Sequence, residues 1–132
     1  MAKQKRLVVI SDLHCGHAVG LTPPAWQWAV DGDTTEHRAK FGRVQREVWD
    51  WYSQTIGSLR PIDILAVNGD AIDGTGVRSG GTELLTTDRQ VQTDMAVKSI
   101  QEASAKTIVM TYGTAYHTGD AEDWEDRVAE HV

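Results

Sequence analysis

Cysteine, proline and phenylalanine are scarce in this 132-residue chain, which has one cysteine, three prolines and one phenylalanine. A single cysteine, Cys15, excludes an intrachain disulfide and any cysteine cluster around zinc. No apolar run approaches the ~20 residues of a membrane-spanning helix. The basic residues 1–6 precede only a strand-length apolar run, which does not resemble a signal peptide. We therefore expect a cytoplasmic protein with no membrane partner.

Positive charge is also in the minority. The chain has 13 Lys and Arg against 19 Asp and Glu, a formal net charge of −6. This balance argues against the broad phosphate-binding surface of a sequence-independent DNA-binding protein. Bound divalent cations would supply positive charge where a phosphate lies. The net charge therefore leaves the substrate class open.

Apolar strand-length segments alternate with amphipathic helical segments along the chain. Strands are predicted at residues 7–10, 62–67 and 107–111. Helices are predicted at 33–57, with Asp33 as N-cap, at 87–103, with Thr87 as N-cap, and at 121–130. This order predicts one α/β domain with a parallel sheet, and the nearly continuous apolar second strand is typical of a sheet covered on both faces. The first helix is expected to turn Val48, Trp51, Tyr52 and Ile56 toward that sheet.

Polar residues that bind metal ions or phosphate follow all three predicted strands. They are Asp12 and His14, then Asp70 and Asp73, then Thr114 and His117. The carboxyl ends of parallel strands share one edge of a sheet, so these side chains can meet there. In extended chain, side chains two residues apart leave on the same side, which pairs the first two. Aspartate after a strand is also a common turn or cap residue, and the pattern alone leaves both interpretations open.

These residues carry a resemblance to the calcineurin-like metallophosphoesterase superfamily. Ser-Asp-Leu-His at 11–14 matches the family's Asp-x-His motif, and Gly-Asp-Ala-Ile-Asp at 69–73 matches its Gly-Asp-x-x-Asp motif. Gly-Thr-Ala-Tyr-His at 113–117 replaces the family's Gly-Asn-His and resembles a variant found among phage and prophage members. The family's later lone His and Gly-His-x-His motifs have no counterpart in the 132 residues.

The resemblance implies a metal centre with assigned ligands. Asp12 and His14 would hold a first cation, Asp70 would bridge two cations, and Asp73 would orient the loop without binding directly. Mixed Asp and His ligands suit manganese, iron or zinc. Two such cations stabilise the attacking and leaving oxygens when a phosphoester is hydrolysed.

The resemblance assigns the remaining candidates less directly. Thr114 is nearest in position to the family's Asn ligand, although a neutral hydroxyl is a poorer ligand. His117 would replace the family's phosphate-contacting histidine and act as general acid. His17 matches a histidine that often follows the first motif. The implied substrate is a phosphoester, with nucleic acid and nucleotide among the candidates, in the host cytoplasm if a phage encodes the chain.

The implied fold is an αββα sandwich, of which this chain would be the first half, a three-stranded parallel core with flanking helices. We expect these residues to be the front portion of a longer protein. Half a sandwich leaves apolar sheet surface uncovered, so a homo-oligomer or another partner is expected. Two other functions stay open: a non-catalytic binding module, and a nucleotide-binding doubly wound domain. The second lacks a glycine-rich fingerprint after its first strand.

Overall fold

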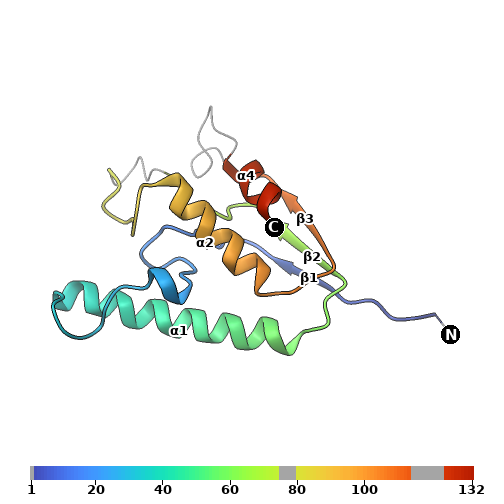
Figure 1. Ribbon diagram of the computed structural model, residues 1–132, viewed down its shortest axis with the longest axis horizontal. Coiled ribbons are helices and arrows are strands. Elements are labelled where there is room, and N and C mark those ends of the chain that lie inside the picture. Colours follow the sequence, from blue (N-terminus) through green and yellow to red (C-terminus); the bar gives the residue numbers. More distant parts are fainter. Residues whose placement is uncertain (1, 75–79, 114–123) are drawn as a thin grey trace.

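The chain folds into an α/β domain around a parallel sheet, shown in Figure 1. The computed structural model describes residues 2–74, 80–113 and 124–132. The strands are β1 (Leu7–Ile10), β2 (Ile64–Asn68) and β3 (Thr107–Thr111), hydrogen-bonded in the order β1-β2-β3. The helices within these ranges are α1 (Glu36–Ser58), α2 (Arg89–Gln101) and α4 (Trp124–His131), with one 3-10 turn, η1 (Pro24–Trp26).

The helices cover one face of the sheet. Leu65 and Val67 of β2 point to this face and are fully buried. Each helix contributes to the core beneath them: Tyr52 comes from α1, Met95 from α2 and Val128 from α4. The register places residues of both β1 and β3 beside the first four residues of β2, so one continuous apolar layer meets the helices.

The opposite face of the sheet is uncovered within the described residues. Leu7 and Val9 of β1 are 60% and 61% exposed, and Val109 of β3 is 51% exposed. In β1 and β3 these side chains alternate with partly buried ones that face the helices, as the pleat of a strand requires. The strand pattern typical of a sheet covered on both faces is therefore matched on one face only within this part of the chain. The expectation of uncovered apolar sheet surface is confirmed.

Helix α1 begins and faces differently from the prediction. Thr35, not Asp33, is the N-cap, and its hydroxyl accepts a hydrogen bond from the Arg38 N–H at 3.2 Å. Trp49 is buried, whereas Trp51 is 67% exposed. The buried stripe includes a polar residue, Gln45, which accepts from the Trp28 N–H and donates to the Ala18 carbonyl, both at 2.8 Å. Because a glutamine occupies the core here, the apolar periodicity alone misplaces the inward face by part of a turn.

The other elements agree with their predictions more closely. The bounds of β1 and β3 are those predicted, and β2 starts two residues later than expected, at Ile64. The N-cap of α2 is Asp88 instead of Thr87, because the Asp88 carboxylate accepts from the N–H groups of Gln90 and Val91. Helix α4 starts at Trp124, and residues 121–123 lie outside the described ranges.

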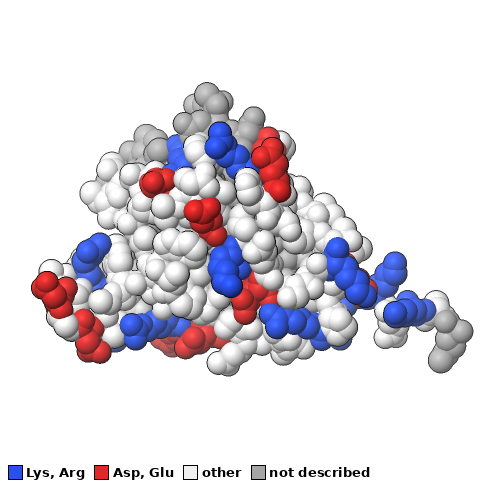
Figure 2. Space-filling model, viewed as in Figure 1, with Lys and Arg blue, Asp and Glu red and all other residues white. Residues whose placement is uncertain are grey.

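The surface over the helices is mixed in charge. Figure 2 shows basic and acidic side chains interspersed on this face, without one broad basic tract. Among the described helices, none combines the length and apolar character needed to cross a membrane. The mixed charge agrees with the overall acidic composition and gives no support to a nonspecific nucleic-acid surface on this side.

Candidate metal centre

The loops after β1 and β2 are joined side by side. The Asp12 N–H donates to the Gly69 carbonyl at 3.2 Å, and the His14 N–H donates to the Asp70 carbonyl at 3.0 Å. Two further backbone hydrogen bonds of 3.0 Å continue this pairing as far as Asp73. The two Asp-containing motifs, more than fifty residues apart in the sequence, are thus held together by main-chain atoms. Their relative position does not depend on side-chain rotamers.

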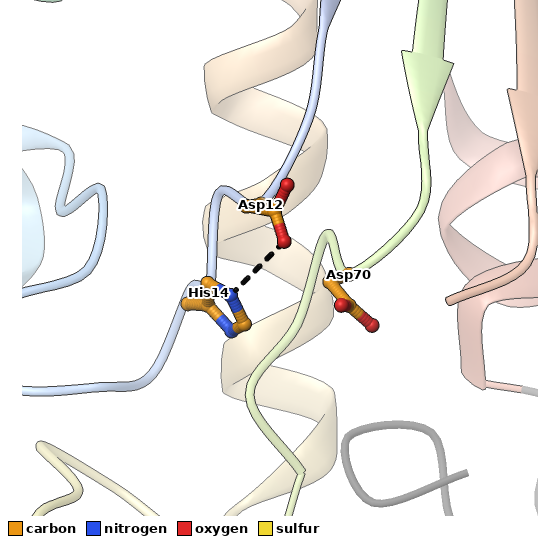
Figure 3. Close-up of side chains that lie close together, drawn as sticks. All are labelled: Asp12, His14 and Asp70. Atoms are coloured by element: carbon orange, nitrogen blue, oxygen red, sulfur yellow. Dashed lines mark ion pairs between the residues drawn. The ribbon is translucent and has the colours of Figure 1, made fainter. Parts of the chain in front are cut away.

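Three predicted ligands meet where these loops join. Asp12, His14 and Asp70 each offer one ligand atom, and these atoms lie within 4.8 Å of one another (Figure 3). The His14 Nε2 lies 3.5 Å from the Asp12 Oδ1. If all three atoms bound one ion with bonds of about 2.1 Å, the distances between them would have to shorten only slightly. The donor set, two carboxylates and an imidazole, fits manganese, iron or zinc.

The ligand residues have an uncommon backbone conformation. Asp12, His14 and Asp70 have φ angles of 55°, 46° and 54°. Residues other than glycine rarely adopt this left-handed region, and such strain concentrates at functional sites. The side chains therefore meet through left-handed turns, and the extended geometry expected for Asp12 and His14 is wrong. Backbone pairing with the neighbouring loop holds these turns in place.

Asp73 lies behind His14. Its Oδ1 is 3.0 Å from the His14 Nδ1, and the residue is 5% exposed. The pKa of His14 is raised above its usual value, first by this hydrogen bond and against the effect of burial. The negative charges of Asp73, Asp70 and Asp12 raise it further. With Nδ1 turned to Asp73, Nε2 faces Asp12, where a cation can take its lone pair. The role predicted for Asp73, to orient His14 without binding an ion, is compatible with this hydrogen bond and stays a prediction.

Sequence reasoning missed Glu125 of α4. It is 3% exposed, and its Oε2 accepts the Gly113 N–H at 2.9 Å. Burial raises the pKa of its carboxyl group; backbone N–H groups of Gly113, Ala71 and Asp70 lower it, and the charge of Asp70 raises it. A glutamate in an acidic helix is usually exposed to solvent, so the sequence did not single out Glu125. The sequence feature that could have predicted its burial is its spacing of three residues from Val128. This spacing places both residues on the inward side of α4, where Val128 is fully buried.

Gln92 of α2 was also missed. Its side chain is fully buried and pairs with both main-chain groups of Gly74, accepting from the N–H at 3.0 Å and donating to the carbonyl at 2.8 Å. It also donates to the Thr86 carbonyl at 2.9 Å. A Cβ on Gly16 would lie 2.5 Å from it. Gln92 thus fixes the end of the loop that carries Asp73. Its spacing of three and four residues from Met95 and Ala96, which are fully buried on the inward face of α2, was the available signal.

A cavity opens beside the ligand group. Its volume is about 760 Å³, and it extends along β1 and α1, where Val48 and Trp51 line it. His14 and His17 line its polar part. His17 is not part of the three-ligand group: its Nδ1 accepts the Val19 N–H at 3.1 Å, and its Nε2 lies 3.7 Å from a Glu83 carboxylate oxygen. An open space next to the ligands leaves room for a substrate.

The third predicted motif is not placed by the structure. Thr114 and His117 lie outside the described residues, so their relation to the ligand group stays a prediction. No protein-family model and no curated protein sequence matches the chain. The assignment of function therefore depends on the geometry of Asp12, His14, Asp70 and Asp73 together with the motifs that contain them.

Proposed function

We propose that this chain is a metal-dependent phosphoesterase domain of the calcineurin-like type. One observation carries the proposal: Asp12, His14 and Asp70 come from two separate loops and place ligand atoms within 4.8 Å of one another. Turn or cap roles would explain an aspartate in each loop, but they would not require a histidine and two aspartates to converge. The left-handed conformation of all three residues adds support, since strain of this kind persists where it serves a site.

The roles follow from the chemistry of each group. Asp12, His14 and Asp70 would bind the cation, and Asp73 would hold the His14 ring in the orientation that presents Nε2. A divalent cation supplies charge for the phosphoryl oxygens and lowers the pKa of an attacking water. His117 is our candidate for the proton donor to the leaving group, because histidine titrates near neutral pH.

The uncovered sheet face supports the same proposal. Parallel sheets are almost always covered on both faces, yet Leu7, Val9 and Val109 are more than half exposed. The first half of an αββα sandwich would present such a face to the second sheet. We therefore propose that this face packs against a second sheet.

A second candidate is a non-catalytic binding module with the same fold. The apolar cavity favours it, because Val48, Trp51 and neighbouring residues of β1 offer a surface that chemistry at the ligand group does not need. This module would retain cation binding and show no turnover. The two candidates therefore differ in activity, not in metal content.

The test is hydrolysis of bis-p-nitrophenyl phosphate and p-nitrophenyl phosphate with manganese(II) added. Turnover that is lost in Asp70→Asn and in His14→Ala, with Asp33→Asn as an exposed-aspartate control, supports the phosphoesterase. Manganese binding without turnover on either ester supports the binding module. A chain that binds no divalent cation contradicts both.

A further inference from the structure

The cavity beside the ligand group has a buried apolar floor. It lies between α1 and β1, which is an edge strand of the sheet in the described part of the chain (Figure 1). Four residues that line it are buried and belong to the hydrophobic core: Leu13, Leu21, Tyr52 and Ile56. The Tyr52 hydroxyl donates to the Ser99 carbonyl at 2.6 Å, so this polar atom is already paired. The floor therefore presents mainly side-chain carbon atoms to an occupant.

The rim of the same cavity carries exposed apolar side chains. Val9, Val19 and Trp51 line it and are 61%, 43% and 67% exposed. Seven large apolar residues are exposed in the described part of the chain, so almost half of them line this cavity. Exposed apolar surface that gathers around a concave site is typical of a ligand-binding groove. An apolar occupant would remove these side chains from water, which is favourable.

The ionisable side chains lie at one end of the cavity only. Those that line it all come from loops around the ligand group: Asp12, His14, His17, Asp73 and Glu83. Among the lining residues of β1 and α1 none is charged, and only Tyr52 and Thr55 carry a hydroxyl group. The sugar and base of a nucleotide would leave several hydrogen-bonding groups without partners there, which is costly. A hydrocarbon group has no such groups and matches this end of the cavity.

We propose that the substrate is an amphiphilic phosphoester, whose phosphate lies at the proposed cation and whose alkyl chain lies in the cavity along β1 and α1. The inference rests on the proposed phosphoesterase and names its substrate class. The volume of about 760 Å³ lies within the range of small-molecule sites. In the reaction the water oxygen bonds to phosphorus, the bond from phosphorus to the ester oxygen breaks, and the released alcohol carries one proton of the water. No further reactant is needed.

Calorimetry with manganese(II) present compares the binding of hexylphosphonate and methylphosphonate to the full chain. Neither is hydrolysed, because a carbon–phosphorus bond replaces the ester bond, so affinity is measured without turnover. Full burial of one methylene group corresponds to about fourfold in affinity. The open groove covers each additional methylene only in part, and we expect hexylphosphonate to bind at least about tenfold more tightly. Phosphate release should likewise show a lower KM for hexyl phosphate than for methyl phosphate.

Two substitutions on the rim test where the alkyl chain lies. Trp51→Ala should reduce the preference for hexylphosphonate at least about threefold, because the indole ring lines the apolar end. Trp51 is mostly exposed, so its removal leaves the core intact. Val9→Ala and Val109→Ala form a matched pair, because both valines are more than half exposed on the same sheet face and only Val9 lines the cavity. Val9→Ala should reduce the preference, and Val109→Ala should leave it unchanged.

Equal affinities for the two phosphonates would overturn the inference, and so would a preference that Trp51→Ala and Val9→Ala both leave unchanged. Turnover of p-nitrophenyl phosphate in the same preparation would then leave the proposed phosphoesterase intact. Selective binding of hexylphosphonate without turnover of hexyl phosphate or p-nitrophenyl phosphate would assign the cavity to the binding module and overturn its role in a substrate. Equal affinities in a chain that sediments as a dimer would indicate that a second copy fills the cavity instead.

Discussion

Replacement of Asp73 by asparagine tests whether the support of His14 matters for cation binding. The Asp73 carboxylate lies 3.0 Å from the His14 Nδ1 and is almost fully buried. Its negative charge is therefore weakly screened and would attract a cation bound at the Nε2 atom of the same ring. Asparagine keeps the size and one acceptor oxygen and removes the charge. The hydrogen bond can therefore persist while the electrostatic contribution is lost.

The magnitude follows from the distance. The hydrogen bond, the width of the ring and a metal bond place the Asp73 charge ~7 Å from a cation bound to Nε2. At an effective dielectric constant of ~20, a dication and a unit charge at this separation attract by about 5 kcal/mol, an upper limit. Mutations of such supporting groups usually weaken metal binding about 10–100-fold, or roughly 1.4–2.7 kcal/mol. We expect a loss in this range, because His14 is partly open to solvent.

Calorimetric titration of wild type and Asp73→Asn with manganese(II) measures the effect. Asp33→Asn, an exposed aspartate outside the site, should leave the Kd unchanged. A change of less than about threefold in Asp73→Asn, smaller than any effect usual for a supporting group, would refute the assignment of Asp73. Equal losses in both variants would trace the effect to overall charge.

Three further predictions concern residues around the site. Gly113→Ala should displace the Asp70 carboxylate, because a Cβ would meet its Oδ1 at 2.0 Å; manganese calorimetry should show affinity weakened at least about tenfold. Gln92→Leu removes the partner of two buried main-chain groups of Gly74 and of the partly buried Thr86 carbonyl. Chemical denaturation should therefore show a loss of about 2–4 kcal/mol, against little change in the exposed Gln54→Leu. Burial raises the pKa of Cys15 to about 12. On the order of 10⁻⁴ of this thiol ionises at pH 8, so a colorimetric thiol reagent should react only after unfolding.

The sequence predicted the parts of the fold that local patterns determine. The bounds of β1 and β3 follow from short apolar runs, and the convergence of Asp12, His14 and Asp70 follows from the common edge of parallel strands. The inward face of α1 was wrong at Trp51, because the buried Gln45 breaks the apolar periodicity. No local pattern reports a polar residue whose partners come from distant loops.

The sequence predicted that Asp12, His14 and Asp70 would lie together, but it did not single out the buried residues that support them. Glu125 and Gln92 are polar residues on helices, and their burial depends on tertiary contacts with Gly113 and Gly74. The left-handed conformation of Asp12, His14 and Asp70 could not be predicted from the motifs either, since Asp and His adopt it only occasionally, in contrast to glycine. Residues that support a site, such as Glu125 and Gln92, are thus harder to recognise in a sequence than candidate ligands. They form hydrogen bonds with backbone atoms, which every residue possesses.

The main-chain pairing between the two ligand loops has a thermodynamic consequence. Neither loop can form the complete binding geometry alone, so an unfolded chain would hold a cation much more weakly than the native one. Free cation at ~100 times its Kd would then add about 2.7 kcal/mol to the free energy of unfolding. Chelation would withdraw the same amount. Under the proposed function, the abundance of this protein in a cell would therefore follow the local supply of the bound cation as well as its rate of synthesis.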